Sequence, residues 1–329
     1  MKRAGNLIEE IQDINNLYWA YYKARRGKAG NSDAMHYAKN LHENIHALRE
    51  QIISGNVSVG NYHYFTIRDP KVRLICAAAF EERVLHHALM NVCHKYFERH
   101  MIYDTYATRI DKGIYAALDK AQAAMLKYDY AGKLDFKKYF NTISHDILKE
   151  KLRRMYKDKR LLSIFDKIID SYETLENRGI PIGNLTSQYF ANFYLSEMDH
   201  YAKEVLRIPV YIRYMDDILV FEHDKSALKN HLSNLRKMAS EKLNLTFKPF
   251  IIIQYCQGLS FLGYKLYRHK CILNSTSRKR FAAKINLYDK RLQENLWDET
   301  VFLNHITPLL AFARYGYTRQ FRLSCLQCK

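Results

Sequence analysis

The 329-residue chain lacks any apolar run long enough to span a membrane, and no apolar signal segment follows its first residues. It also lacks proline-, glycine- or serine-rich linkers, internal repeats and low-complexity tracts. Its six cysteines are scattered. These absences predict a globular protein with free thiols in a reducing, cytoplasmic setting.

One close cysteine pair stands at the end of the sequence, Cys325 and Cys328. A single CxxC supplies at best half of a zinc site. We therefore favour an ordinary frayed tail over a metal site.

Acidic residues are scarce relative to basic ones, with 34 against 52 and a formal net charge of +18. Such an excess favours an anionic polymer as partner, usually nucleic acid, although a generally basic protein is the plain alternative. The 26 tyrosines and 16 phenylalanines strengthen the nucleic-acid interpretation, because aromatic rings can stack on bases. Most of these rings should nevertheless lie in the core.

Strand and helix patterns are mixed without strict alternation, which predicts an α+β protein with helical additions. The patterns predict helices at residues 6–25, 33–54, 79–97, 185–198 and 225–243, another helix beginning after the N-cap Ser144, and helical structure from about 276. They predict strands at residues 62–67, 72–75 and 130–136, and hairpin elements at 209–221 and 259–266.

The most informative stretch is Tyr214-Met215-Asp216-Asp217, where two carboxylates interrupt a run that otherwise resembles a buried strand pair. A buried carboxylate without a partner is costly. A hard divalent cation, which prefers oxygen ligands, would offset that cost. The stretch therefore predicts a β-hairpin with a metal-binding carboxylate at its tip.

Asp135 is the best second donor, because it ends a predicted strand. Two-metal nucleotidyl transfer needs carboxylates from separate elements, so that two ions lie about 4 Å apart. Taken alone, Asp135 is more typical of a turn or a helix start than of a catalytic site. Together with the acidic hairpin, it favours the catalytic interpretation.

These residues together resemble the motifs of reverse transcriptases over roughly residues 60–270. The matching stretches are Asp135 with Phe140 for motif A, Gly183-Asn184-Leu185-Thr186-Ser187-Gln188 for motif B, Tyr214-Met215-Asp216-Asp217 for motif C, and Phe261-Leu262-Gly263-Tyr264 for motif E. The resemblance implies a right-hand polymerase with an antiparallel palm sheet. It would divide into an N-terminal extension and fingers (1–125), a palm with a fingers insertion (126–270) and a helical thumb (271–329).

The resemblance also implies the metal site. Asp135 and Asp216 would hold two Mg²⁺ ions, with Mn²⁺ as a substitute, the backbone carbonyl of Phe136 as a further ligand and Asp217 as a supporting carboxylate. Phe140 would be the steric gate that selects deoxynucleotides, unless it is a plain core phenylalanine.

Basic side chains of the same motifs would contact the substrates. Lys71 and Arg73 would bind the triphosphate, although either is otherwise an exposed strand cation. Lys248 would be the motif D lysine that protonates the leaving pyrophosphate, with a solvated surface lysine as the equal alternative.

Other residues would contact the nucleic acid. Arg109 and Lys112 would bind template or primer phosphates, and Gly263 belongs to the grip on the primer. Arg278 and Arg280 lie in a basic stretch that could follow a nucleic-acid backbone.

The residues of motif B indicate which kind of reverse transcriptase the chain resembles. Group II intron and retroviral enzymes usually have Gln before the motif glycine and Pro after the serine, whereas this chain has Ile182 before Gly183 and Gln188 after Ser187. This form resembles the reverse transcriptases of diversity-generating retroelements, which are bacterial or phage-encoded. Those enzymes copy a template-repeat RNA, misincorporate opposite adenines and supply mutagenised cDNA to a variable gene.

A physical route to low fidelity follows from Ile182. A glutamine beside the nascent pair can form a hydrogen bond that penalises poor geometry, and an isoleucine cannot. The alternative is that Ile182 is a neutral packing variant.

The resemblance implies template-repeat RNA, a cDNA or primer, dNTPs and a basic pentameric accessory variability determinant as partners. Nothing after residue 270 resembles an RNase H, maturase or endonuclease domain, so we expect such functions from elsewhere. The alternatives are a retron or phage-defence reverse transcriptase, or a non-catalytic RNA-binding subunit with a polymerase fold.

Overall fold

The computed structural model describes residues 3–28, 30–68 and 72–327. Lys71 and Cys328 therefore lie outside the described residues. The chain forms two compact units, one of residues 1–109, 135–207 and 234–248, the other of residues 110–134, 208–233 and 249–329. Each unit gathers segments that are far apart in the sequence.

The first unit is mainly helical and contains one two-stranded hairpin. Its elements are α1 (Leu7–Ile11), α2 (Ile14–Arg25), α3 (Ser32–Lys39), α4 (Leu41–Ser54), β1 (Tyr62–Arg68), β2 (Val72–Ala78), α5 (Phe80–His100), α7 (Tyr139–Thr142), α8 (His145–Met155), α9 (Lys159–Asp170), α10 (Leu185–Tyr194), α11 (Ser196–His200) and a π-helical turn (Tyr201–Val205). The second half of α12 (Lys225–Leu243) also belongs to it.

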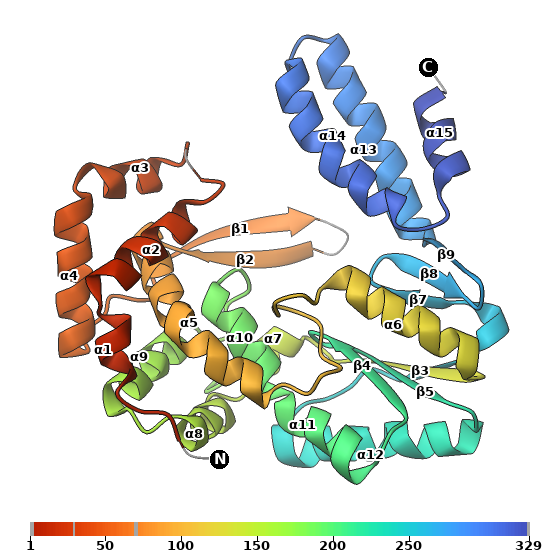
Figure 1. Ribbon diagram of the computed structural model, residues 1–329, viewed down its shortest axis with the longest axis horizontal. Helices are drawn as coiled ribbons and strands as arrows, with labels where there is room; N and C mark the ends of the chain where they lie inside the picture. The colour runs from red at the N-terminus through yellow and green to blue at the C-terminus, as the bar shows by residue number, and fades with distance from the viewer. Residues whose placement is uncertain (1–2, 29, 69–71, 328–329) are drawn as a thin grey trace. The chain divides into compact units, whose positions relative to one another are not determined.

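The core of the first unit is built around α5, which α2 and α10 contact (Figure 1). The ring of Phe97 is almost fully buried, and its centroid lies 5.4 Å from that of Phe193 on α10. The antiparallel pair β1 and β2 is exposed along most of its length. The hairpin is thus held mainly by its end nearest α5, where Cys76 is buried.

The second unit contains two antiparallel sheets and the C-terminal helices. Its elements are α6 (Ile114–Lys127), β3 (Tyr130–Asp135, whose last residue belongs to the first unit), β4 (Val210–Tyr214), β5 (Asp217–Glu222), the first half of α12, β6 (Ile251–Gln254), a 3₁₀ turn (Tyr255–Gln257), β7 (Leu259–Phe261), β8 (Tyr264–Tyr267), β9 (Lys270–Leu273), α13 (Ser275–Gln293), α14 (Glu299–Arg314) and α15 (Arg319–Gln327).

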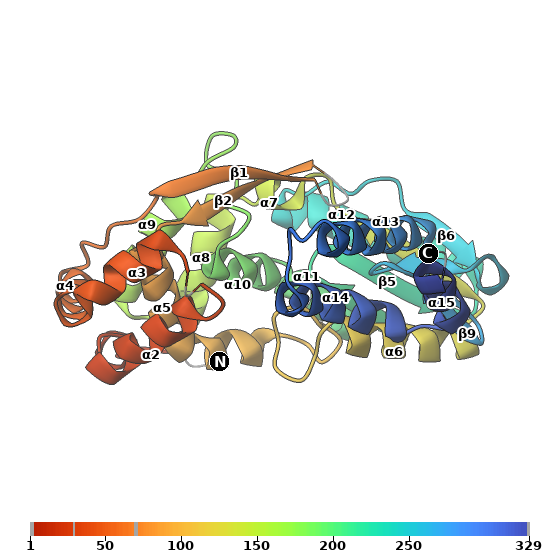
Figure 2. The same ribbon diagram turned by 90° about the horizontal axis from the view of Figure 1, so that it is seen from above.

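The larger sheet has the strand order β4-β5-β3-β6, and the smaller has β7-β8-β9. Helices α6 and α12 cover opposite faces of the larger sheet (Figures 1 and 2). On the α12 face, a Cβ atom at Gly132 would lie 2.8 Å from Leu232 Cδ1, so only a glycine lets the helix pack this closely on β3. The α+β class predicted from the sequence is confirmed.

Local signals placed several elements correctly. Ser144 caps α8 by accepting a hydrogen bond from the backbone N–H of Ile147, and α12 has the predicted bounds. The helix predicted at 6–25 is instead two helices, because the Asp13 side chain accepts hydrogen bonds from two backbone N–H groups at the start of α2. Helices α6 and α9 were not predicted. Of the helices in the described ranges, none combines the length and apolar character that crossing a membrane requires.

Candidate active site

The acidic stretch forms the predicted hairpin. Strands β4 and β5 are antiparallel, and Tyr214 pairs with Asp217, so Met215 and Asp216 make a two-residue turn. Met215 has φ +54°, a left-handed conformation typical of such tight hairpin turns. Asp216 therefore lies at the tip and Asp217 begins β5, and both are half-buried.

A buried arginine stabilises this turn from within the sheet. Arg213 is fully buried, and its Nη1 donates a hydrogen bond of 3.1 Å to the carbonyl of Met215. Burial also raises the pKa of the neighbouring Tyr214 phenol. The sequence argument did not single out Arg213, although one arginine in an otherwise apolar strand was the available signal.

Asp217 has a lysine as its counter-ion. Lys133 Nζ lies 3.1 Å from Asp217 Oδ1, with side-chain exposures of 23% and 33% respectively. The same ammonium donates a hydrogen bond of 3.3 Å to the carbonyl of Ser260 on β7. Lys133 was also missed, although it stands two residues before Asp135 and so on the same face of β3.

Asp135 ends β3 and is likewise held by a lysine. Lys248 Nζ lies 2.5 Å from Asp135 Oδ2, and the Lys248 backbone N–H donates to the Asp135 carbonyl at 2.9 Å. The Lys248 side chain is therefore an ion-pair partner of a carboxylate here, and it is 42% exposed.

The carbonyl of Phe136, next to Asp135 in the chain, faces away from the neighbouring segment around Phe247. Phe136 bridges Phe247, and their rings stack with centroids 3.9 Å apart. The ladder bonds on either side join Lys137 N–H to Thr246 O and Lys248 N–H to Asp135 O. Phe136 is thus a non-hydrogen-bonded pair, so its own carbonyl faces away from Phe247.

These donors fit a hard divalent cation in kind, because carboxylate and carbonyl oxygens are what Mg²⁺ binds. Asp135 and Asp217 each have an ammonium group beside the carboxylate, where a metal cation would compete. In the described part of the chain, no group of three or more His, Cys, Asp or Glu side chains is close enough to hold an ion.

The motif B loop is fixed against β2. The Ile182 carbonyl accepts a 2.8 Å hydrogen bond from the Cys76 backbone N–H, while the Ile182 side chain is half-buried. Gly183 has φ +128°, and a Cβ there would lie 2.9 Å from Ile75 Cγ2. Residue 183 must therefore be glycine both for its backbone conformation and for this close approach.

The residues after Gly183 extend the attachment. Buried Asn184 accepts a 3.1 Å hydrogen bond from the Ala78 backbone N–H through its Oδ1. Thr186 is also buried. Gln188, by contrast, is exposed on α10. Asn184 is a positioning residue that the sequence argument did not identify.

Phe140 and Arg73 are two further predicted substrate residues of the first unit. Phe140 is half-buried in α7, so it is not a fully buried core residue, and its carbonyl accepts a 2.9 Å hydrogen bond from Ile180 N–H. Arg73 is exposed on β2. Lys71, the other predicted triphosphate contact, is outside the described residues.

Arg109 has an internal role in this structure. Its guanidinium donates to Glu98 Oε1 at 2.8 and 2.6 Å, to the Ile102 carbonyl, and to the carbonyl and hydroxyl of Thr105. Its side chain is 10% exposed. Because these donors are used within the protein, a phosphate contact would require the guanidinium to leave Glu98, and the assignment of Arg109 to a template or primer phosphate stays a prediction. Lys112 is half-buried in the turn that follows.

Gly263 occupies a tight turn between β7 and β8. Leu262 and Gly263 have φ +47° and +90°, and a Cβ at residue 263 would lie 2.9 Å from Phe312 Cζ on α14. This packing alone explains the glycine. On α13, exposed Arg278 places its guanidinium 4.5 Å from the centroid of the Phe321 ring, and Arg280 is half-buried.

Residues 67–266, more than half of the chain, match the reverse transcriptase (RNA-dependent DNA polymerase) family. The hairpin, the strand that ends at Asp135 and the loop at Gly183 all lie within the matched range. The chain belongs to this family.

Particular relatives are distant. The chain is 21% identical over 276 residues to protein YkfC of Escherichia coli K12, covering 69% of this chain and 72% of YkfC. It is 20% identical over 218 residues to a protein of Saccharomyces cerevisiae named for COX1/OXI3 intron 1, covering 62% of this chain and 26% of that one.

Solved structures support the fold. A telomerase from Candida tropicalis, in complex with a fragment of telomeric RNA, matches with a TM-score of 0.52 and 13% identity, over 82% of this chain and 56% of the telomerase. An apo form truncated from the C-terminal domain matches with a TM-score of 0.50 and 12% identity, over 65% of this chain and 55% of that one. This chain thus spans about half the length of the telomerases and shares their polymerase fold.

Proposed function

We propose that this chain is an RNA-directed DNA polymerase of a diversity-generating retroelement, which makes adenine-mutagenic cDNA from a template-repeat RNA. The observation that carries the polymerase activity is the acidic hairpin turn on a strand that is next to β3 in the sheet. Strand β5 begins at Asp217 and β3 ends at Asp135. Membership of the reverse transcriptase family supports the same activity.

In this proposal Asp135, Asp216, Asp217 and the Phe136 carbonyl would hold two Mg²⁺ ions. When bound, these ions would activate the primer 3′-hydroxyl and neutralise charge on the triphosphate. Lys133 and Lys248 balance the charges of the Asp217 and Asp135 carboxylates in this structure. Lys248 would then be close enough to Asp135 to move a proton at the leaving pyrophosphate.

The selection of deoxynucleotides is assigned to Phe140. Its half-buried ring is anchored at the backbone by Ile180, so the ring position is tied to the motif B loop. Arg73 and Lys71 would bind the triphosphate, and Lys112, Gly263, Arg278 and Arg280 would face the nucleic acid. Phe140→Val should admit ribonucleotides, and unchanged dNTP preference would remove this role from Phe140.

Primer extension on an RNA template with Mg²⁺ tests the activity. Asp216→Asn is isosteric and should abolish synthesis, because it removes a metal-binding charge. Asp224→Asn, at the start of α12 in the same unit, is the matched control and should retain synthesis. Intact synthesis by Asp216→Asn would overturn the metal assignment.

The mutagenic subclass rests on Ile182 and Gln188. The Ile182 carbonyl is bonded to β2 and its side chain has no polar atom, so it cannot test the geometry of a base pair. Sequencing of the cDNA should show errors concentrated opposite template adenines. Ile182→Gln should lower the error rate, and an unchanged error rate would show that Ile182 does not cause the low fidelity.

Two alternative functions predict different results in the same sequencing experiment. A retron or phage-defence reverse transcriptase would make cDNA whose errors are spread over all four template bases. A non-catalytic RNA-binding subunit would make none. The fingers, palm and thumb boundaries at residues 125 and 270, and the pentameric accessory protein, belong to the same proposal.

A further inference from the structure

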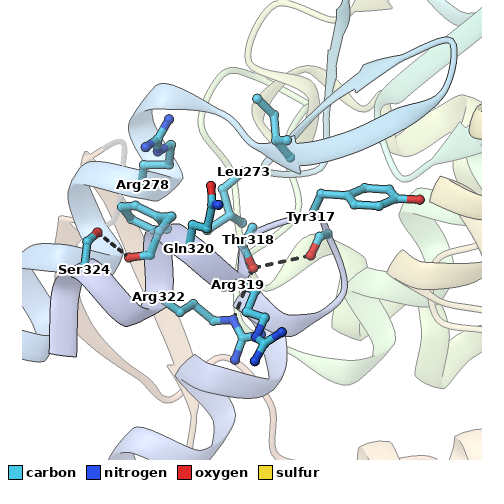
Figure 3. A pocket seen from close by; sticks show the side chains of 11 residues that line it. Leu273, Arg278, Tyr317, Thr318, Arg319, Gln320, Arg322 and Ser324 are labelled. Carbon is cyan, nitrogen blue, oxygen red and sulfur yellow. Dashed lines mark hydrogen bonds between the residues drawn. The ribbon is translucent and has the colours of Figure 1, made fainter. Parts of the chain in front are cut away.

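Outside the acidic hairpin, a cavity of about 730 Å³ lies among the C-terminal elements. It is lined by β9, the start of α13, the segment between α14 and α15, and α15 itself, all within the second unit (Figure 3). None of the aspartates of the catalytic proposal lines it. Its volume falls in the usual range for small-molecule sites, about 300–1,000 Å³.

The walls of this cavity are fixed by hydrogen bonds and close packing. The Tyr317 backbone N–H donates to the Cys271 carbonyl on β9 at 2.7 Å, and the buried Thr318 hydroxyl donates to the Ala313 carbonyl. A Cβ at Gly316 would lie 2.8 Å from the Cys271 carbonyl oxygen. The segment before α15 therefore fits against β9 only with glycine at residue 316, and the cavity is preformed.

The charge of the cavity is of one sign. Arg278, Arg319 and Arg322 line it, and in the described part of the chain no acidic side chain does. Arg319 and Arg322 are three residues apart on α15, so they share one face of the helix. Arg322 Nε donates to Thr318 Oγ1 at 3.3 Å, which directs this guanidinium toward the start of α15 (Figure 3).

The cavity also offers flat and apolar surfaces. Tyr317 is 76% exposed, and its ring extends from the rim of the cavity away from Arg319 and Arg322 (Figure 3), although its backbone is anchored. The Arg278 guanidinium already stacks on the Phe321 ring, which leaves its N–H edges available to an anion. Leu273 is an apolar part of the lining. A nucleotide base stacks on aromatic or guanidinium planes, and its phosphates bind the paired N–H groups of arginine.

We propose that this cavity binds the backbone of a single-stranded nucleic acid on Arg319 and Arg322, with one unpaired base against Tyr317 at its rim. A base within a duplex is covered by its neighbours and could not stack on Tyr317, so the site distinguishes a single strand from a duplex. The inference rests on the proposed function for the class of ligand, but not on catalysis or on the metal site.

The test measures affinity of the full chain for a fluorescein-labelled uridine oligomer of about twelve nucleotides, by fluorescence anisotropy. The site variant is Arg319→Gln with Arg322→Gln. The matched control is Lys290→Gln with Arg314→Gln, two exposed residues of α13 and α14 that do not line the cavity. Both variants lose two charges, so general electrostatic attraction falls equally.

The site variant should bind the oligomer about tenfold more weakly than the control variant, since two arginine–phosphate contacts are lost. Duplex RNA should bind the two variants equally. Tyr317→Leu, which keeps every charge, should also weaken the uridine oligomer, and an abasic oligomer should bind the unmodified chain more weakly. Thermal melting of each variant shows that α15 remains folded.

Equal losses in the site and control variants would overturn the proposal, as would equal binding of abasic and uridine oligomers. A polyglutamate peptide that binds the unmodified chain more tightly than the uridine oligomer, and loses affinity in the site variant but not in the control variant, would assign the cavity to an acidic protein segment instead. Asp216→Asn should keep full affinity for the oligomer. If the unmodified chain binds the oligomer at this cavity but makes no cDNA, the polymerase proposal is refuted and the binding proposal stands.

Discussion

Lys133→Met tests whether the lysine beside Asp217 competes with a metal ion. The substitution keeps most of the side-chain volume and removes one positive charge 3.1 Å from the carboxylate. At this distance the Coulomb energy of a pair is about 5 kcal/mol for an effective dielectric constant of about 20. Because both side chains are partly exposed and their hydration is lost in the pair, the net contribution should be about 1–2 kcal/mol.

A metal ion must overcome this contribution to reach Asp217. Lys133→Met should therefore raise the affinity for a divalent cation about tenfold. Binding of Mn²⁺, followed by the EPR signal of the free ion, measures this directly without any turnover. Lys127→Met, an exposed lysine at the end of α6, removes the same charge away from Asp217 and should leave Mn²⁺ affinity unchanged.

The metal-free protein provides a second readout. Without Lys133, the half-buried Asp217 carboxylate loses its ion-pair partner, so the melting temperature should fall, and added Mn²⁺ should restore it. An Mn²⁺ affinity of Lys133→Met equal to or weaker than that of Lys127→Met would refute this reasoning. Lys133 would then support the site rather than compete for it.

Three further predictions concern stability. Gly183→Ala should lower the melting temperature more than the control Gly113→Ala. Both glycines have similar φ angles, 128° and 122°, but only at residue 183 would the new Cβ have atoms within 4 Å. Equal shifts in melting temperature would contradict the close approach of Gly183 to β2. Arg213→Met should reduce the free energy of unfolding, measured in urea, by about 2 kcal/mol, since the Met215 carbonyl at the turn loses its buried, charged donor. Burial, and after it nearby positive charges, lowers the pKa of His87 from 6.5 to about 4. The unfolded chain therefore binds a proton between these values that the folded chain does not, so stability should fall as the pH is lowered through this window, and His87→Asn should flatten the profile.

Local sequence signals determined a large part of the fold. Helix α12 and the two-residue hairpin at Met215 and Asp216 follow from patterns within about twenty residues. Their stability depends on periodicity and turn geometry that neighbouring residues encode. Helix α9 was missed although its apolar face is strongly periodic, so the signal was present in the sequence.

The order and spacing of the motifs determined the family, because Asp135, Phe140, Gly183 and the acidic hairpin each stand where a reverse transcriptase has them. Residue types and spacing identify such motifs without any knowledge of contacts. By themselves they do not say which side chains surround each motif residue.

Those neighbours were decided by the tertiary structure. Lys133 reaches Asp217 because β3 and β5 are adjacent in the sheet, and Lys248 reaches Asp135 across 113 residues of sequence. Arg109, which the family resemblance assigns to a template or primer phosphate, donates hydrogen bonds to Glu98 and nearby carbonyls within the protein. Charge pairing of this kind depends on strand order and loop closure, which bring distant residues within about 4 Å. The sequence alone thus identified the acidic residues, and the fold decided which cations they face.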